Sequence, residues 1–307
     1  KLCPELAQLS GWLILAKPSG PTSRDLLNLL QKQFRGLKIG HAGTLDPLAS
    51  GLLLVAIGHA TRLVEFTHRF DKSYEATIRL GATSPTDDAD GPWSERPDAR
   101  VCSLPEIREG LSQLTGPQVL QIPPRFSAIQ KGGQRSYDLA RKGEEFELEP
   151  RPVRIDKIEI TSYEWPLLQV IVDCGAGTYI RSIARDLGEI CGVGGMIENL
   201  HRTRIGPFEM ANAITTESLC SMEDLKSHLL PSDMALSEWP EQILDEQQLP
   251  DILHGKKVSL CIQDCETWEG REIRCKDQQD NLIALGRIES SHRQWLIQPF
   301  RVFHQED

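Results

Sequence analysis

The chain has 307 residues, of which 39% are hydrophobic and 25% charged, as is ordinary for a folded protein of about two domains. No apolar run approaches the ~20 residues that cross a bilayer, and the N-terminal segment lacks the apolar core of a signal peptide, so we expect a cytoplasmic protein without a membrane segment. The net charge of −10 argues against a simple nucleic-acid-binding protein, although it allows one whose basic residues gather on one face.

The first predicted elements surround a loop rich in glycine, proline and serine. Residues 11–16 have the pattern of a strand. Thr22 is a good N-cap, and Asp25 completes a capping box, which predicts a helix directly after Thr22. The loop then spans residues 38–51, and the apolar run at 52–57 predicts a buried strand.

The middle of the chain mixes strand and helix patterns without regular alternation. Residues 73–80 alternate like a half-buried strand, and an acidic loop is expected at 83–98. Two further strands are predicted at 153–160 and 167–174. A helix follows whose apolar face has helical spacing and is formed by Ile180, Ile183, Ala184, Leu187 and Ile190. This order predicts an α+β fold with a mixed sheet.

The C-terminal part has a different character. Residues 230–247 resemble a linker, with two prolines and several acidic residues. Short strand patterns follow at 258–262, 282–286 and 294–298. We therefore predict one domain at residues 1–240 and a small β-rich domain at 241–307.

The eight cysteines are scattered and predict reduced thiols. Cys261, Cys265 and Cys275 lie closest together, but their spacing fits none of the paired patterns of zinc sites. Small, buried apolar side chains are the favoured interpretation, so no metal site is predicted.

Basic and acidic residues gather in different segments. The three basic clusters are Lys32, Arg35, Lys38 and His41, then His201, Arg202 and Arg204, and then Arg125, Lys131 and Arg135. Acidic residues concentrate at Asp87, Asp88, Asp90 and Glu95. This asymmetry is compatible with one basic face and one acidic face, although each run can equally be solvated surface.

Four residues in three segments are candidates for chemistry. Asp46 lies in the loop before the buried strand, where a rigid scaffold can hold a catalytic carboxylate, but it can also form a turn before Pro47. Tyr179 and Arg181 fall at a predicted helix start, which favours anions, although Arg181 can instead pair with a surface acid. Tyr74 is either a core residue or a platform that stacks on an unpaired base.

Residues 40–51, GHAGTLDPLASG, resemble the catalytic motif of TruB-type tRNA pseudouridine synthases. Four further segments resemble motifs of that family, in family order: 15–23 (LAKPSGPTS), 72–76 (KSYEA), 121–128 (QIPP and FSA) and 177–181 (GTYIR). Five ordered motifs over roughly residues 11 to 210 are far more specific than one short pattern.

The resemblance implies an isomerase that converts a uridine in the T-loop of tRNA, conventionally position 55, into pseudouridine without a cofactor or metal. Asp46 would be the nucleophile, Arg181 would pair with it and keep it ionised, and Tyr74 would stack on the target uracil. The base would leave its stack before reaction.

Further residues are implied to bind the substrate. Tyr179 and the backbone near Leu200 would line the base pocket, and His41 would fill the space left by the flipped nucleotide. Lys17 would support the active-site loop, and Arg202 is expected to contact the RNA.

The resemblance also implies the fold and the partners. A mainly antiparallel catalytic sheet with flanking helices would precede a PUA-like domain. The enzyme would act as a monomer without an obligatory protein partner and bind the T-arm and acceptor end of tRNA.

Three alternatives stay open. A guide-RNA-dependent pseudouridine synthase of the dyskerin type shares the aspartate motif, although the segment at 126–128 favours the stand-alone form. A tRNA-folding or tRNA-binding protein would need no catalysis. A glycosidase using Asp46 would need a second nearby carboxylate as its acid.

Overall fold

The computed structural model describes residues 9–126, 130–131, 134–135, 148–260, 268–291 and 294–303. Ser127 and Ala128 of the predicted middle motif lie outside the described residues, as do Cys261 and Cys265. None of the helices in the described ranges has the length and apolar character needed to span a bilayer.

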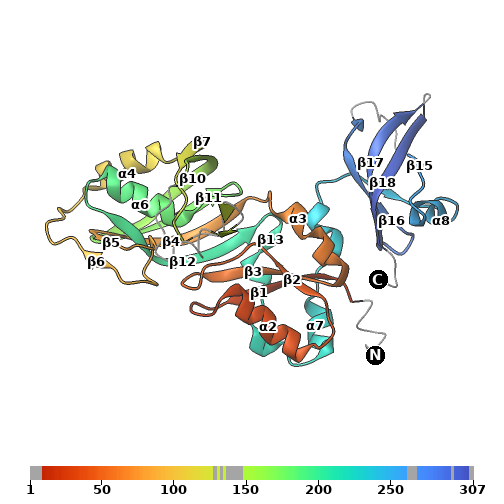
Figure 1. The fold of residues 1–307 in the computed structure, drawn as a ribbon, viewed down its shortest axis with the longest axis horizontal. Coiled ribbons are helices and arrows are strands. Elements are labelled where there is room, and N and C mark those ends of the chain that lie inside the picture. The colour runs from red at the N-terminus through yellow and green to blue at the C-terminus, as the bar shows by residue number, and fades with distance from the viewer. Residues whose placement is uncertain are drawn as a thin grey trace.

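A nine-stranded mixed sheet forms the body of the molecule (Figure 1). Its main path runs β1-β3-β12-β4-β11-β10-β7, with β2 paired to β3 and β13 paired to β12. The strands are β1 (Gly11–Lys17), β2 (Ile39–Ala42), β3 (Ser50–Ile57), β4 (Lys72–Leu80), β7 (Gly116–Gln121), β10 (Arg151–Glu164), β11 (Leu167–Cys174), β12 (Gly195–Ile205) and β13 (Phe208–Glu209). All of these pairings are antiparallel except that of β12 with β3.

Helices and short elements flank this sheet and the C-terminal part of the chain. In the described residues the α-helices are α2 (Ser23–Gln33), α3 (Val64–Thr67), α4 (Leu104–Gln113), α6 (Ile180–Ile190), α7 (Met222–His228) and α8 (Gln248–Leu253), of which α8 packs on the C-terminal part. The 3₁₀ helices are η1 (Gly58–Leu63), η2 (Met210–Asn212), η3 (Thr216–Ser218) and η4 (Ser232–Leu236). Two small hairpins pair β5 (Ala82–Thr83) with β6 (Ser94–Glu95), and β8 (Gln130–Lys131) with β9 (Gln134–Arg135).

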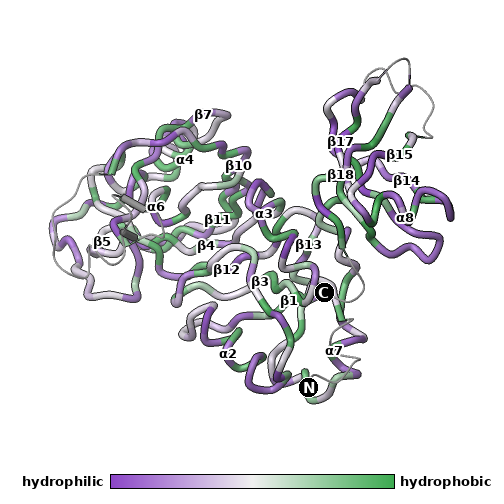
Figure 2. Tube along the Cα trace, turned by 45° about the vertical axis from the view of Figure 1, so that its right-hand side comes forward, coloured by the Kyte–Doolittle hydropathy of each residue, from purple (hydrophilic) through white to green (hydrophobic). Residues whose placement is uncertain are grey.

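Helix α2 begins as its capping box predicts. The Thr22 side chain accepts a hydrogen bond from the backbone of Asp25, whose carboxylate accepts one from the backbone of Thr22. The helix buries Leu26, Leu27 and Leu30 against apolar residues of β1 and β3. Figure 2 shows β1 and β3 as largely hydrophobic segments, in agreement with their burial.

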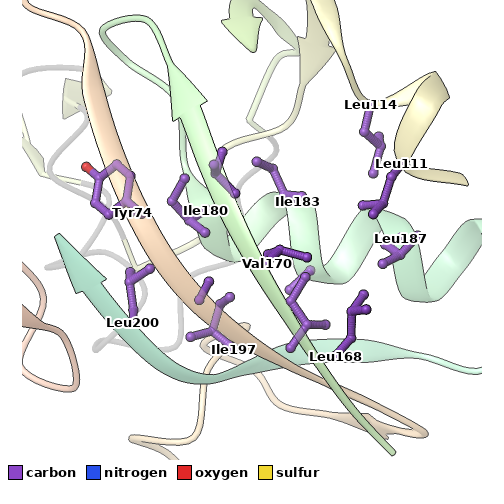
Figure 3. Close-up of a cluster of buried hydrophobic side chains, with 14 of the residues drawn as sticks. Tyr74, Leu111, Leu114, Leu168, Val170, Ile180, Ile183, Leu187, Ile197 and Leu200 are labelled. Atoms are coloured by element: carbon purple, nitrogen blue, oxygen red, sulfur yellow. The ribbon is translucent and has the colours of Figure 1, made fainter. Parts of the chain in front are cut away.

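Helices α4 and α6 pack on the other half of the sheet. Figure 3 shows Ile183 and Leu187 of α6 directed toward Val170 and Leu168 of β11, and all four side chains are buried. The predicted apolar face of α6 is confirmed except at Ile190, which is 43% exposed because the helix ends beyond the edge of the core.

A second sheet of five strands occupies the C-terminal part, in the order β14-β16-β17-β18-β15 (Figure 1, blue). Its strands are β14 (Glu241–Ile243), β15 (Val258–Ser259), β16 (Glu272–Lys276), β17 (Leu282–Ser291) and β18 (Gln294–Val302). The strands predicted at 282–286 and 294–298 are confirmed and longer than expected, whereas β14, β16 and α8 were not predicted.

The five-stranded sheet has its own core and also joins the core of the body. Ile273, Ile283 and Ile297 are among the residues of its own buried cluster. Leu285 and Phe303, by contrast, belong to a cluster with body residues such as Trp12 and Phe208. The C-terminal sheet is therefore docked against the body through apolar side chains.

Candidate active site

The segment that carries Asp46 connects β2 to β3, so part of the loop expected at residues 38–51 is a strand. Ser23, the first residue of α2, accepts a hydrogen bond from the backbone N–H of Leu45 at 3.0 Å and donates one to its carbonyl at 3.1 Å. Lys17 Nζ donates to the carbonyls of Pro47 at 3.1 Å and Ala49 at 2.6 Å. We call residues 43–49 the aspartate loop.

Arg181 contacts the Asp46 side chain. The distance from Arg181 Nε to Asp46 Oδ2 is 3.0 Å, and the side chains are 6% and 38% exposed respectively. Arg181 Nη1 also donates to the carbonyl of Thr86 at 3.0 Å, and Nη2 donates to that of Phe126 at 2.9 Å. The alternative that Arg181 pairs with a surface acid is wrong, because its guanidinium is buried.

Asp88 is a second carboxylate on the same guanidinium, although the sequence indicated only an acidic loop at this position. Its Oδ2 lies 3.5 Å from Arg181 Nη1, and Thr86 Oγ1 donates to its Oδ1 at 2.6 Å. The neighbouring Asp87 pairs with Arg185 at 3.1 Å. The expectation of an acidic face is thus wrong at these two positions, since both carboxylates turn inward toward α6. Arg181 and Arg185 lie four residues apart on one face of α6, and this spacing was the sequence feature that could have predicted two buried carboxylate partners.

Burial raises the pKa of the Asp46 carboxyl above its usual range, and Asp88 acts in the same direction. The guanidinium of Arg181 opposes that rise, as do the charges of Arg202 and Lys17. The Asp46 side chain is 38% exposed, so water on its open side reduces the effect of burial on this pKa. Arg181 therefore favours the ionised carboxylate, but it does not bring the pKa below the usual value.

Tyr74 lies on β4 at the margin of the core cluster. Figure 3 shows its ring beside Leu200 of β12, with the hydroxyl on the side away from Ile180. Burial raises the pKa of the Tyr74 hydroxyl. Tyr179 is the N-cap of α6, and its backbone is held by Gln121, which accepts from its N–H at 2.8 Å and donates to its carbonyl at 3.0 Å. The sequence alone did not indicate that role for Gln121.

The remaining predicted residues near the aspartate loop are Lys17, His41 and Arg202. Lys17 is fully buried, and burial lowers its pKa to about 8. His41 Nδ1 is buried and has no hydrogen-bond partner in the described ranges, and burial lowers the pKa of the ring. Arg202 is only 1% exposed, so the expected surface cluster is wrong at this position, and its guanidinium is not open to RNA in this structure.

Comparisons with known proteins identify the family. The model described as TruB family pseudouridylate synthase (N terminal domain) matches residues 29–180, and that described as tRNA pseudouridylate synthase B C-terminal domain matches residues 181–237. The chain belongs to the TruB family of pseudouridylate synthases.

Several TruB-family relatives match nearly the whole chain. The tRNA pseudouridine synthase B of Dinoroseobacter shibae is 41% identical, over 96% of this chain and 95% of the relative. That of Heliobacterium modesticaldum is 38% identical, over 97% of each. The five-stranded sheet lies beyond both matched family models, so its likeness to a PUA domain stays a prediction.

Solved structures agree with the TruB-family fold. A chain in the crystal structure of a Cbf5–Nop10–Gar1 complex has a TM-score of 0.71 and 25% identity, covering 99% of this chain and 87% of that chain. A chain in an H/ACA RNP bound to a substrate RNA containing 2′-deoxyuridine has a TM-score of 0.72 and 24% identity, covering 100% and 89%. The predicted α+β fold with a mainly antiparallel sheet is confirmed.

Proposed function

We propose that this enzyme isomerises the uridine at conventional position 55 of the tRNA T-loop to pseudouridine, with Asp46 as the nucleophile and without a cofactor. The curated relatives carry the name tRNA pseudouridine synthase B. The observation that carries the residue assignment is the contact of Asp46 with the buried guanidinium of Arg181.

The reaction suits a fixed carboxylate. The bond between uracil N1 and ribose C1′ breaks, the base turns, and C5 forms a new bond to C1′ while its proton leaves and N1 gains one. Substrate and product have the same atoms, so neither oxidation nor hydrolysis occurs. A carboxylate beside C1′ can stabilise or capture the positive charge that develops on the sugar, as carboxylates do in glycosidases.

Tyr74 and Arg181 have separate roles in this proposal. The Tyr74 ring lies beside Leu200 and is 7% exposed, and in this proposal it would stack on the extruded uracil and so offset the few kcal/mol needed to extrude the nucleotide. Arg181 is held by Asp88 and by two backbone carbonyls, so its charge stays beside Asp46 throughout the reaction. Such a preset charge needs no reorganisation during the reaction.

A glycosidase is disfavoured by the state of Asp88. This carboxylate ion-pairs with the guanidinium that contacts Asp46, and its side chain is only 5% exposed. A general acid has to reach the leaving group directly or through one water molecule. Asp88 is therefore unsuited to be the second carboxylate that a glycosidase needs.

The test uses purified protein and an unmodified tRNA transcript, with no other protein or RNA added. Pseudouridine is mapped by carbodiimide labelling and primer extension. We expect a new stop in the T-loop with the wild-type chain, and a rate lower by on the order of 10³-fold or more with Asp46→Asn. Asp251→Asn, which neutralises an exposed carboxylate paired with Lys256, should retain the rate.

Three results would contradict this proposal. If the folded wild-type chain produced no T-loop stop, the assigned reaction would be wrong. A stop that appeared only after a second RNA was added would support the guide-dependent alternative. Wild-type activity in Asp46→Asn would remove the role of this carboxylate.

A further inference from the structure

Arg202 is a buried cation that the proposed chemistry does not use. It lies on β12 and is 1% exposed. Within the described part of the chain, no carboxylate lies within salt-bridge distance of its guanidinium. A buried charge without a carboxylate partner is costly unless hydrogen bonds replace its hydration.

The guanidinium of Arg202 interacts with the hydroxyl of Tyr74 and donates three hydrogen bonds to backbone carbonyls near the aspartate loop. Nε donates to the carbonyl of Leu52 at 2.9 Å, Nη1 to that of Thr44 at 3.3 Å and Nη2 to that of Gly43 at 3.5 Å. Thr44 and Gly43 precede Asp46, and Leu52 lies in the buried part of β3. The rigid guanidinium thus connects the start of the aspartate loop, at Gly43 and Thr44, to strand β3 at Leu52.

The close approach of β12 to β3 makes this contact possible. Arg202 is paired with Gly51 in the parallel register of the two strands. Gly51 has a φ of +103°, and a Cβ at this position would lie 2.3 Å from the carbonyl oxygen of Arg202. Only glycine allows the backbones to meet there without displacement.

A second buried cation holds the other half of the same loop. Lys17 donates to the carbonyls of Pro47 and Ala49, which follow Asp46. Arg202 holds Gly43 and Thr44, which precede it. The loop is therefore held on both sides of Asp46 by side chains from two different strands.

We propose that Arg202 is a positioning residue for catalysis, which fixes the aspartate loop by its three backbone hydrogen bonds and adds positive charge behind Asp46. This inference rests on the proposed function of Asp46. It replaces the expected contact of Arg202 with RNA, because a guanidinium that is 1% exposed does not reach a phosphate.

Four charged groups face Asp46 from different elements: Arg181 of α6, Lys17 of β1, Arg202 of β12 and Asp88 of the acidic loop. Arg202 lowers the pKa of Asp46, so its removal should raise that pKa further. If activity requires the ionised carboxylate, the acid limb of the pH–rate profile then moves to higher pH. A purely structural role would not produce this shift.

The test compares Arg202→Met with Arg202→Lys on unmodified tRNA transcript. Misplacement of a reactive group by about 1 Å can lower a rate about 10²-fold, so we expect Arg202→Met to lower kcat by about that factor with KM changed less than about threefold. Its acid limb should lie at higher pH. Arg202→Lys keeps the charge but lacks the planar fork, so it should retain the wild-type acid limb and recover only part of kcat.

Arg274→Met is the matched control, because Arg274 is largely buried in the C-terminal sheet and pairs with Asp233. It should lower stability without moving the pH profile. Wild-type kcat and pH profile in folded Arg202→Met would overturn the proposal, as would the same changes in Arg274→Met. If Arg202→Met does not fold, wild-type kcat in Arg202→Lys overturns it. An inactive wild-type chain would instead refute the proposed function.

Discussion

At the scale of single residues, the ionisation of Asp46 depends on opposing neighbours. Burial and the carboxylate of Asp88 raise its pKa, whereas Arg181, Arg202 and Lys17 lower it. In the proposed reaction the ionised form is the nucleophile, so activity should fall as the pH drops through this raised pKa. The acid limb is therefore expected at higher pH than for an ordinary aspartate.

Asp88→Asn should move the acid limb of the pH–rate profile in the opposite direction to Arg202→Met. It removes a negative charge that raises the pKa of Asp46, so the pKa should fall and the acid limb should move to lower pH. It also loosens Arg181, which should reduce kcat about tenfold at neutral pH, by the loss of roughly 1.4 kcal/mol. Measured pH–rate profiles check the sign, and a shift to higher pH would contradict this account of the site.

At the scale of elements, the start of α2 links helix capping to the active site. Thr22 caps the helix from an exposed position, whereas the next residue, Ser23, is buried and bonds to Leu45 of the aspartate loop. Thr22 therefore contributes to helix stability alone, whereas Ser23 contributes both to stability and to the position of the loop. Substituting each by alanine should therefore have different consequences.

Ser23→Ala leaves the buried N–H and carbonyl of Leu45 without this partner, which should cost about 1–3 kcal/mol and lower kcat. Thr22→Ala should cost about 1 kcal/mol through the lost cap and leave kcat unchanged. Urea denaturation and the rate on tRNA transcript measure the two effects. Equal kcat in both variants would show that Ser23 does not position the loop.

At the scale of the whole molecule, ion pairs and apolar contacts hold the C-terminal sheet against the body. Asp233 of η4 lies 2.7 Å from both Arg274 Nη1 and Lys276 Nζ of β16. Phe303 joins the body core, and the guanidinium of Arg62 lies 5.0 Å from the centroid of its ring. The position of the C-terminal sheet relative to Asp46 is therefore set by packed contacts rather than by the linker alone.

Asp233→Ala should lower the free energy of unfolding by about 3 kcal/mol, because two largely buried cations lose a shared carboxylate. Denaturant titration measures the change. Asp251→Ala is the control, because its exposed pair with Lys256 should contribute less than about 1 kcal/mol. Similar losses in the two variants would show that the Asp233 pairs do not stabilise the docked sheet.

The sequence by itself determined the features that depend on short stretches of chain. The Thr22–Asp25 capping box, the alternation of β4 and most of the apolar face of α6 follow from residue spacing. The family followed from five ordered motifs, and comparison with relatives confirmed it. Asp46 and Arg181 entered through the same motifs, while their roles stay proposals.

Only the tertiary structure decided which distant charges meet. Asp88 looked like part of an acidic surface loop, and Arg202 like part of a basic patch, yet both are buried. Local spacing does not specify these environments, because they arise when the sheet brings β3 beside β12 and the acidic loop beside α6. The free energy of a buried charge depends on the partners that such long-range pairing supplies, and those partners are separated from it along the chain.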